Sequence, residues 1–509
     1  MRQRRLATLA VVALALAAIG GVGLSRARAG LIRTIAAVDG LPIELITPAA
    51  GAPGPWPGVV VVHGFSGSRQ LMYGIAQTLA RNGYAAAVVD LPGHGQNPSR
   101  MSMRPGRPFG FDEVLVRATT WLRAQPGVDG TRLAVVGHSM GAGAVLRFAT
   151  RSTTIGATVA ISAGLGPRGR VDAHVPRNVL AIAGAWEFAN VLDACRAAVT
   201  ASYPQAGATE RQGSWADGSA RQCVVVPGVE HISVLFSQTT ATATVRWLDG
   251  ALGAYPPARP VQTAIPMGSA LWLHAAGAVL FLLLAEVMFP RPRVIAGPTA
   301  SLPGLALGIL VAASATIAAL AMRFLPGGWI PLLTADYLCG FFAVMGLVIV
   351  AGLARLGRPI GGPRPSRAVA WRSIVLAAGA FVMFALVAQV SWMNVHLVGA
   401  RRSLAVAIFP LWLLYFLASD AMLRTRPARE YFAWWAGSVV LTTAVLVAAV
   451  FTLRAPFFLL LLVPALLPMF LWLGLYGHWL RARTPSAWPT ACVAAAFFAW
   501  LVAAVFPLV

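Results

Sequence analysis

Lysine is absent from the sequence, and acidic residues are few. Only 11% of the 509 residues are charged, and 40 basic residues, all of them arginine, stand against 17 Asp and Glu, for a net charge of +23. A strongly basic chain can bind nucleic acid, but no basic cluster interleaved with aromatic residues occurs in a polar segment. We therefore expect no nucleic-acid partner. The absence of lysine is typical of a GC-rich genome and favours a bacterial source.

Cysteine is also scarce. The four cysteines are Cys195, Cys223, Cys339 and Cys492, and no C-x-x-C spacing occurs among them. This excludes the usual zinc-ribbon and redox motifs. Cys195 and Cys223 lie outside the long apolar runs. The sequence leaves open whether they form a disulfide, as an exported domain would allow, or two buried free thiols.

Long apolar runs, in contrast, are abundant. Hydrophobic residues make up 58% of the chain and the mean hydropathy is +0.71, so much of the chain is expected in lipid. The first run, 6–24, follows Arg2, Arg4 and Arg5. Its length suits a spanning helix better than the ~7 to 15 apolar residues of a signal peptide. We predict an N-terminal membrane anchor over residues 1–30, with a cleaved signal peptide as the alternative.

A second membrane domain is predicted over residues 268–509, after a linker at 253–267 that is rich in proline and glycine. It contains eight apolar segments of about the ~20 residues that a bilayer requires. The predicted segments are 268–289, 302–323, 331–354, 373–395, 404–423, 433–453, 456–480 and 487–508.

The arginines predict the orientation of these segments. The loops after the first, third, fifth and seventh segments hold twelve arginines, and the alternate loops hold only four. Arginine-rich loops tend to stay in the cytoplasm, so the linker and the domain before it are expected outside. The arginines before the first apolar run favour the same orientation. We expect a multi-pass protein of the bacterial inner membrane, with a cytoplasmic N-terminus, an extracytoplasmic domain over residues 31–252, and the lipid bilayer as its partner.

Residues 31–252 alternate short predicted strands with amphipathic helices. Asp39-Gly40 joins two of the strands and is a strong hairpin signal. Residues 59–62 are four consecutive valines, as expected for a central parallel strand that is covered on both faces. The pattern predicts a doubly wound, mostly parallel sheet, and hence an α/β domain beside an all-α transmembrane domain.

A G-x-S-x-G motif occurs at Gly137–Gly141, between the predicted strand 133–136 and a following helix. In this position the glycines allow a turn sharp enough to expose the hydroxyl of Ser139 at the start of the helix. Because the bare pattern is common, the strand and helix around it are what make the motif informative. Ser139 is therefore predicted to be a nucleophile.

A serine hydroxyl needs a base, and the base needs a group that orients it. His231 directly follows one predicted strand and is the expected base, while Glu187 directly follows the preceding one and is the expected acid. Asp172 and Asp193 are the rival acids, although they suit a solvated loop and a helix surface. The order of Ser139, acid and histidine is the order found in α/β-hydrolases.

The reaction also needs two backbone N–H donors for an oxyanion. One is expected from Met140, which follows the nucleophile, and the other from Phe65 in the loop His63–Gly67 after the third strand.

The chain resembles the α/β-hydrolase family from Thr34 to about Leu252. The resemblance rests on His63–Gly67, the loop Asp90–Gly95, the Ser139 turn and the terminal G-x-x-H at 228–231. It is strongest to the lysophospholipase, esterase and dienelactone-hydrolase branches. The resemblance implies a Ser-acid-His hydrolase without metal or cofactor, acting on esters or less often on amides, and a structural role for the Asp90–Gly95 loop. The chain departs from the family in having Glu at the acid position and only a short segment, 165–176, where many members insert a large cap.

The sequence thus predicts a membrane-bound serine hydrolase for a small ester or lipid-like substrate. One alternative is a transporter or lipid-handling protein with an accessory hydrolase or sensing domain. A serine peptidase, an acyltransferase, and a binding module that has lost its activity are further alternatives. Glu286, Asp336 and Asp420 fall near the ends of apolar segments. We expect them at the membrane interface rather than in an ion pathway.

Overall fold

The computed structural model divides into two compact units. The sheet unit consists of Ala15–Ala275 with Ala385–Val398 and Pro507–Val509, and the helical unit consists of Met1–Leu14, Ala276–Phe384 and Gly399–Phe506. The residues that the structure describes are 2–49, 54–103, 110–164, 172, 174–253, 255, 259–289, 301–481, 484 and 486–509.

An eight-stranded sheet forms the centre of the sheet unit, with the strand order β1-β2-β4-β3-β5-β6-β7-β8. β1 and β2 are antiparallel to their neighbours, and β3 to β8 run parallel. The predicted doubly wound, mostly parallel sheet is confirmed. The strands are β1 Leu31–Val38, β2 Leu41–Pro48, β3 Trp56–Val62, β4 Ala85–Val89, β5 Val128–His138, β6 Ile155–Ile161, β7 Val179–Gly184 and β8 Arg221–Val226.

The predicted hairpin joins β1 and β2. Asp39 and Gly40 have φ values of 48° and 79°, as a two-residue turn between antiparallel strands requires. The valines of β3, in contrast, lie in the middle of the sheet and are fully buried. Both local patterns in the sequence therefore produced the expected structure.

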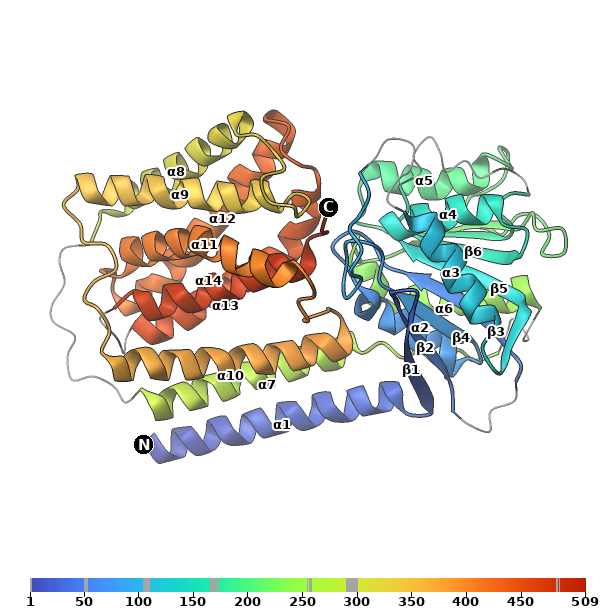
Figure 1. Ribbon diagram of the computed structural model, residues 1–509, viewed down its shortest axis with the longest axis horizontal. Coiled ribbons are helices and arrows are strands. Elements are labelled where there is room, and N and C mark those ends of the chain that lie inside the picture. Colours follow the sequence, from blue (N-terminus) through green and yellow to red (C-terminus); the bar gives the residue numbers. More distant parts are fainter. Residues whose placement is uncertain are drawn as a thin grey trace. The chain divides into compact units, whose positions relative to one another are not determined.

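Helices cover both faces of the sheet (Figure 1). α2 and α6 pack on one face, where they share a core with the inner strands, and α3, α4 and α5 pack on the other. A short 3-10 turn, η1 Arg69–Met72, precedes α2. The helices are α2 Tyr73–Arg81, α3 Phe111–Arg123, α4 Met140–Arg151, α5 Ala189–Thr200 and α6 Gln238–Leu252, and a second 3-10 turn is η2 Ser233–Phe236.

Eight helices among the described residues are long and apolar enough to cross a membrane. The predicted segment 456–480 is the exception, because α13 bends by 47° between Phe458–Pro464 and Leu466–Arg481. Two prolines inside this helix, Pro464 and Pro468, remove backbone donors and explain a bend at this point. The helices are α1 Arg2–Arg28, α7 Met267–Met288, α8 Gly304–Phe324, α9 Ala335–Arg355, α10 Arg367–Ser391, α11 Arg401–Leu423, α12 Ala428–Thr452, α13 Phe458–Arg481 and α14 Trp488–Val505.

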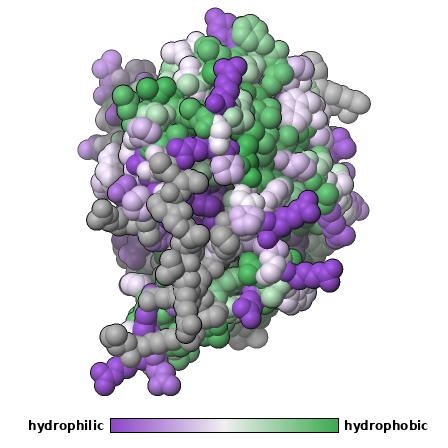
Figure 2. Space-filling model, turned by 90° about the vertical axis from the view of Figure 1, so that its left-hand side faces the viewer, coloured by the Kyte–Doolittle hydropathy of each residue, from purple (hydrophilic) through white to green (hydrophobic). Residues whose placement is uncertain are grey.

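The helical unit has one end where α7, α9, α11 and α13 finish (Figure 1). Hydrophilic side chains gather there among apolar surface (Figure 2). Two carboxylates near helix ends are buried in ion pairs: Asp420 with Arg424 at 2.6 Å, and Glu286 with Arg5 at 3.3 Å. Pairing with arginine lowers the cost of burying these two charges.

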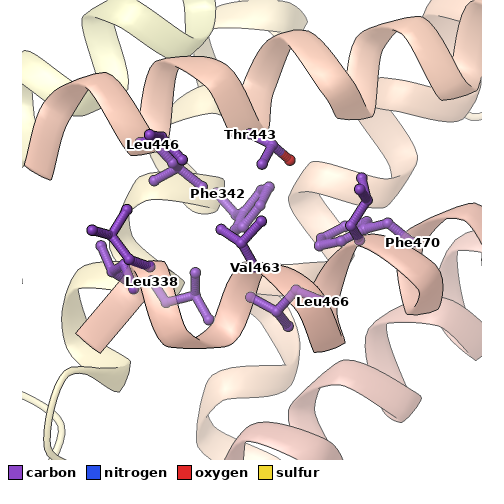
Figure 3. A pocket seen from close by; sticks show the side chains of 11 residues that line it. Leu338, Phe342, Thr443, Leu446, Val463, Leu466 and Phe470 are labelled. Atoms are coloured by element: carbon purple, nitrogen blue, oxygen red, sulfur yellow. The ribbon is translucent and has the colours of Figure 1, made fainter. Parts of the chain in front are cut away.

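A small cavity lies between α9, α12 and α13 in the helical unit (Figure 3). Leu338, Phe342, Val463 and Phe470 are among the residues that line it, and Thr443 supplies the single polar side chain of the described lining. The described side chains that line this cavity are therefore almost entirely apolar.

Candidate active site

Ser139 occupies the turn between β5 and α4, as predicted. Its backbone has φ 52° and ψ −115°, a conformation that is unfavourable for a residue with a side chain. Two backbone hydrogen bonds hold the turn: the N–H of Ser139 donates to the carbonyl of Ile161 at 2.8 Å, and that of Gly143 donates to the carbonyl of Ser139 at 3.1 Å. The packing around the turn thus fixes the position of the Ser139 hydroxyl.

The two glycines that flank Ser139 are required by close backbone contacts. A Cβ atom on Gly137 would lie 2.4 Å from the carbonyl oxygen of Gly141, and one on Gly141 would lie 2.4 Å from the carbonyl oxygen of His63. Any side chain at either position would therefore displace the backbone beside Ser139.

His231 lies in the turn after β8 and reaches Ser139. Its Nε2 is 2.8 Å from the Oγ of Ser139. The turn is braced by Glu230, whose carboxylate accepts hydrogen bonds from the backbone N–H groups of Ile232 and Ser233, both at 2.8 Å. The imidazole is buried, so its orientation is set by the protein rather than by solvent.

Glu187 lies in the loop after β7, on the far side of His231 from the serine. Its two carboxylate oxygens are 3.1 Å and 3.0 Å from Nδ1 of His231, and its side chain is fully buried. The backbone N–H of Trp186 donates to the carbonyl of Val229 at 3.0 Å, which joins the loop of the acid to the loop of the histidine. Ser139, His231 and Glu187 therefore form one continuous hydrogen-bonded chain.

The rival acids lie elsewhere. Asp172 is exposed and accepts hydrogen bonds from the backbone N–H groups of His174 and Val175, which lower its pKa. Asp193 is exposed on α5 and forms an ion pair with Arg196 at 3.3 Å. Each carboxylate has its own local partner.

The loop His63–Gly67 packs directly on Ser139. A Cβ atom on Gly64 would lie 3.0 Å from the Cβ of Ser139, and the N–H of Gly67 closes the loop on the carbonyl of Gly64 at 3.1 Å. Phe65 follows Gly64 in this loop, and Met140 is the first residue of α4. The residues expected to provide the two N–H donors therefore border the serine from two different elements.

Two further histidines, which the sequence analysis did not assign, brace the site. His138 donates from Nε2 to the carbonyl of His231 at 2.8 Å, and burial lowers its pKa to about 3. His63 accepts the N–H of Leu91 at its Nε2, 3.0 Å away, and burial lowers its pKa too. Both rings are therefore neutral at pH 7. The sequence signal that could have identified them is that each lies within one of the two recognised motifs, His63–Gly67 and Gly137–Gly141.

The loop Asp90–Gly95 supports the site, in line with the structural role that the resemblance implied. The carboxylate of Asp90 accepts the backbone N–H groups of Arg69 at 2.7 Å and Gln96 at 3.0 Å, and it pairs with the guanidinium of Arg69. The ring of His94 packs against those of His63 and Phe65, at centroid distances of 5.0 Å and 6.3 Å. Asp90 and His94 thus hold the loop that borders Ser139.

The sheet order, the elbow between β5 and α4, and a match of residues 55–203 to the family model described as serine aminopeptidase, S33, identify the fold. The sheet unit has the α/β-hydrolase fold. The sheet unit and this match cover only part of the chain, and the helical unit lies outside the match. No curated protein matches the sequence.

Three solved structures illustrate what the sheet unit is similar to. A putative dienelactone hydrolase from Klebsiella pneumoniae subsp. pneumoniae is 18% identical, with 44% of this chain and 99% of that one covered and a TM-score of 0.34. An esterase from Pyrococcus furiosus is 15% identical, with 44% and 93% covered and a TM-score of 0.32. A predicted hydrolase from Thermoplasma acidophilum is 16% identical, with 43% and 97% covered and a TM-score of 0.33.

A disulfide joins α5 to β8. It links Cys195 to Cys223, with 5.5 Å between their Cα atoms. The sequence left open whether these cysteines form a disulfide or stay as free thiols, and the structure shows the disulfide. α5 begins two residues after Glu187, and β8 ends five residues before His231. The disulfide therefore connects the two elements that flank the acid and the histidine.

Proposed function

We propose that the chain is a membrane-bound serine hydrolase that cleaves carboxylic esters. The observation that carries the proposal is the hydrogen-bonded chain from Ser139 through His231 to Glu187, with distances of 2.8 Å and 3.0 Å. Such a chain is what converts a weak hydroxyl nucleophile into a strong one.

Acylation begins when Ser139 attacks the ester carbonyl. His231 Nε2 takes the hydroxyl proton, and Glu187 keeps the other proton on Nδ1 and stabilises the imidazolium that forms. The backbone N–H groups of Phe65 and Met140 donate to the oxyanion of the tetrahedral intermediate. The intermediate collapses as the ester oxygen leaves with the proton from His231, which gives an alcohol and an acyl group on Ser139.

Deacylation repeats these steps with water. His231 takes a proton from a water molecule, which attacks the acyl carbonyl. The second tetrahedral intermediate then expels the Ser139 oxygen, and His231 returns the proton to it. The carboxylic acid leaves and the free serine is restored. The proposed cycle uses neither a metal nor another cofactor.

Peptide bonds are the second candidate substrate, because residues 55–203 match a family model described as serine aminopeptidase. The same triad can attack an amide, and the distinction depends on protonation of the leaving group. The resemblance to the esterase branch favours esters. Trp186, which is 72% exposed and adjacent to Glu187, offers an apolar surface near the site for the non-polar part of an ester or lipid-like substrate.

We further propose that the hydrolase domain lies outside the cytoplasm of a bacterial cell, anchored in the inner membrane. The disulfide between Cys195 and Cys223 supports an oxidising compartment, since such bonds rarely persist in the cytosol. The uneven distribution of arginine between alternate loops supports the same orientation.

The test is labelling of membranes that contain the protein with a fluorophosphonate probe, which reacts with an activated serine. We expect the wild type to be labelled and Ser139→Ala to lose labelling. Ser162→Ala is the matched control, since Ser162 also follows a strand of the sheet and also has a positive φ, 52°. Full labelling of Ser139→Ala, or no labelling of the folded wild type, would contradict the proposed function.

A substrate series then distinguishes the two candidates. Nitrophenyl esters of graded chain length test ester hydrolysis, and aminoacyl nitroanilides test amide hydrolysis. Both release a coloured product, so their rates can be measured in the same way. We expect the ester rate to exceed the amide rate by orders of magnitude. A preference for the nitroanilides would favour the peptidase instead.

A further inference from the structure

The loop that borders Ser139 is bonded to a segment more than three hundred residues away in the sequence. The backbone N–H of Asn394 donates to the Oγ of Ser68 at 3.0 Å, and both residues are buried. Asn394 belongs to Ala385–Val398, which is part of the same compact unit as the hydrolase domain. Ser68 directly follows the loop His63–Gly67.

Ser68 has an unusual partner for its position. It precedes η1, where a serine commonly accepts a hydrogen bond from the first backbone N–H groups of the helix, but its side chain makes no such bond here. The hydroxyl accepts the N–H of Asn394 instead. The next residue, Arg69, is held by Asp90 through its backbone N–H at 2.7 Å. Two successive residues at the end of the loop, Ser68 and Arg69, are therefore each held by a hydrogen bond to another segment.

The segment that presents the Asn394 N–H is itself braced. The side chain of Asn394 donates to the carbonyl of His396 at 2.9 Å, and the side-chain oxygen of Gln389 accepts the N–H of Val395 at 2.9 Å. The N–H groups of Trp392 and Met393 both return to the carbonyl of Ala388 at the end of α10. These bonds hold the donor in one position rather than leaving it on a free loop.

A second distant segment holds the neighbouring loop. The N–H of Leu508 donates to the carbonyl of Gly93 at 2.9 Å, and its carbonyl accepts the N–H of Met101 at 2.8 Å. A Cβ atom on Gly93 would lie 2.6 Å from the carbonyl oxygen of Leu508, so the contact requires a glycine. His94, next in this loop, packs against Phe65. Both loops beside Ser139 are thus supported by residues that follow the predicted linker.

We infer that Ser68 is a positioning residue, through which Asn394 fixes the Phe65 N–H for the oxyanion. The inference rests on the proposed function. An oxyanion donor acts mainly in the transition state, so displacing it lowers kcat more than it changes KM. A displacement of about 1 Å can cost on the order of 100-fold in rate. The α10–α11 connection is then part of the catalytic machinery, although it is remote in sequence.

The experiment compares Ser68→Ala with Ser219→Ala in the full-length protein. Ser219 is also buried and its hydroxyl also accepts one backbone N–H, from Ser214 at 2.9 Å, but it precedes β8, away from Ser139. We expect both variants to lose similar thermal stability. Only Ser68→Ala should lower kcat and the fluorophosphonate labelling rate, by about 10- to 100-fold, with KM within threefold.

Two further variants separate positioning from folding. Ser68→Thr keeps the acceptor oxygen, and the extended backbone of Ser68, φ −152°, accepts a β-branched residue, so it should retain the wild-type kcat. Asn394→Pro removes the donor and should lower kcat as Ser68→Ala does, whereas Asn394→Ala keeps the N–H and should lower kcat less. The double variant Ser68→Ala/Asn394→Pro should be no slower than Ser68→Ala, because both changes break one bond.

A kcat for Ser68→Ala within twofold of that for Ser219→Ala would overturn the inference and leave the proposed function intact. An equal loss in Ser68→Thr would also overturn it. If the fluorophosphonate probe does not label the folded wild-type protein, the proposed function fails, and this inference fails with it.

Discussion

At the scale of single residues, the site joins three side chains that are far apart in the sequence. Ser139, Glu187 and His231 each follow a parallel strand. Because the carboxyl ends of parallel strands meet at one edge of the sheet, the sequence could place them near one another. The sequence could not predict that His231 contacts Glu187 through Nδ1 and Ser139 through Nε2. These contacts depend on how the loops pack, for example on the hydrogen bond between Trp186 and Val229.

The proposed role of Glu187 leads to a test on the acid. Glu187→Gln keeps the size of the side chain, but its amide can donate to Nδ1 and so favour the imidazole tautomer with its proton facing Ser139. We expect kcat to fall by about 1,000- to 10,000-fold, because that tautomer cannot take the serine proton. Asp193→Asn, at an exposed carboxylate on α5, is the control and should leave kcat unchanged. A small effect of Glu187→Gln would remove Glu187 from the triad.

The neutral His138 makes stability depend on pH. Burial lowers its pKa to about 3, while the unfolded chain has a histidine pKa near ~6.5. Between these values the unfolded state binds a proton that the folded state does not. The free energy of unfolding is therefore fully maintained above pH ~6.5 and falls by about 1.4 kcal/mol per pH unit below it.

His138→Gln removes this titrating group. Thermal unfolding of the purified protein, followed from about pH 7 to about pH 4, should show a shallower loss of stability in the variant than in the wild type. The pKa of His63 is also lowered by burial, so some pH dependence should remain in both. Identical slopes would contradict a neutral, buried His138.

At the scale of secondary-structure elements, local signals predicted the sheet well. The Asp39-Gly40 turn and the apolar valines of β3 each specify a structure within a few residues. The bend of α13 was missed, although Pro464 and Pro468 were visible in the sequence, because the length and hydropathy of the segment suggested one straight span. The 3-10 turn η1 before α2 was not predicted, since its geometry depends on the bonds to Asp90.

The disulfide between α5 and β8 is expected to stabilise the hydrolase domain. It closes a loop with a sequence separation of 28, for which loss of chain entropy in the unfolded state corresponds to about 3.5 kcal/mol. Cys195→Ala/Cys223→Ala should lower the thermal midpoint, and a reductant should lower that of the wild type but not that of the variant. A wild-type midpoint that does not respond to complete reduction would contradict this stabilisation.

At the scale of the whole molecule, the sequence predicted helices but not the contacts of the segments between them. The bond between Asn394 and Ser68 joins residues 326 positions apart, and no periodicity or motif marks either one. The burial of Asp420 and Glu286 in ion pairs was likewise not visible, because position near a helix end also suits the membrane interface.

The proposed orientation is tested by the accessibility of introduced cysteines. Arg123→Cys on the hydrolase domain and Arg364→Cys between α9 and α10 both replace exposed arginines. In a Cys492→Ala background, a membrane-impermeant maleimide should label the first in intact spheroplasts and the second only after lysis. The reverse pattern would place the hydrolase domain in the cytoplasm.

The outermost strand of the sheet affects how the hydrolase domain behaves once it is separated from the rest of the chain. β1 has a neighbour on one side only, and it exposes Ile35 by 71% and Ile32 by 44%. An open strand edge with exposed isoleucines can pair with another copy of itself. An excised domain is therefore expected to aggregate through β1, and a charged substitution such as Ile35→Lys should keep it dispersed.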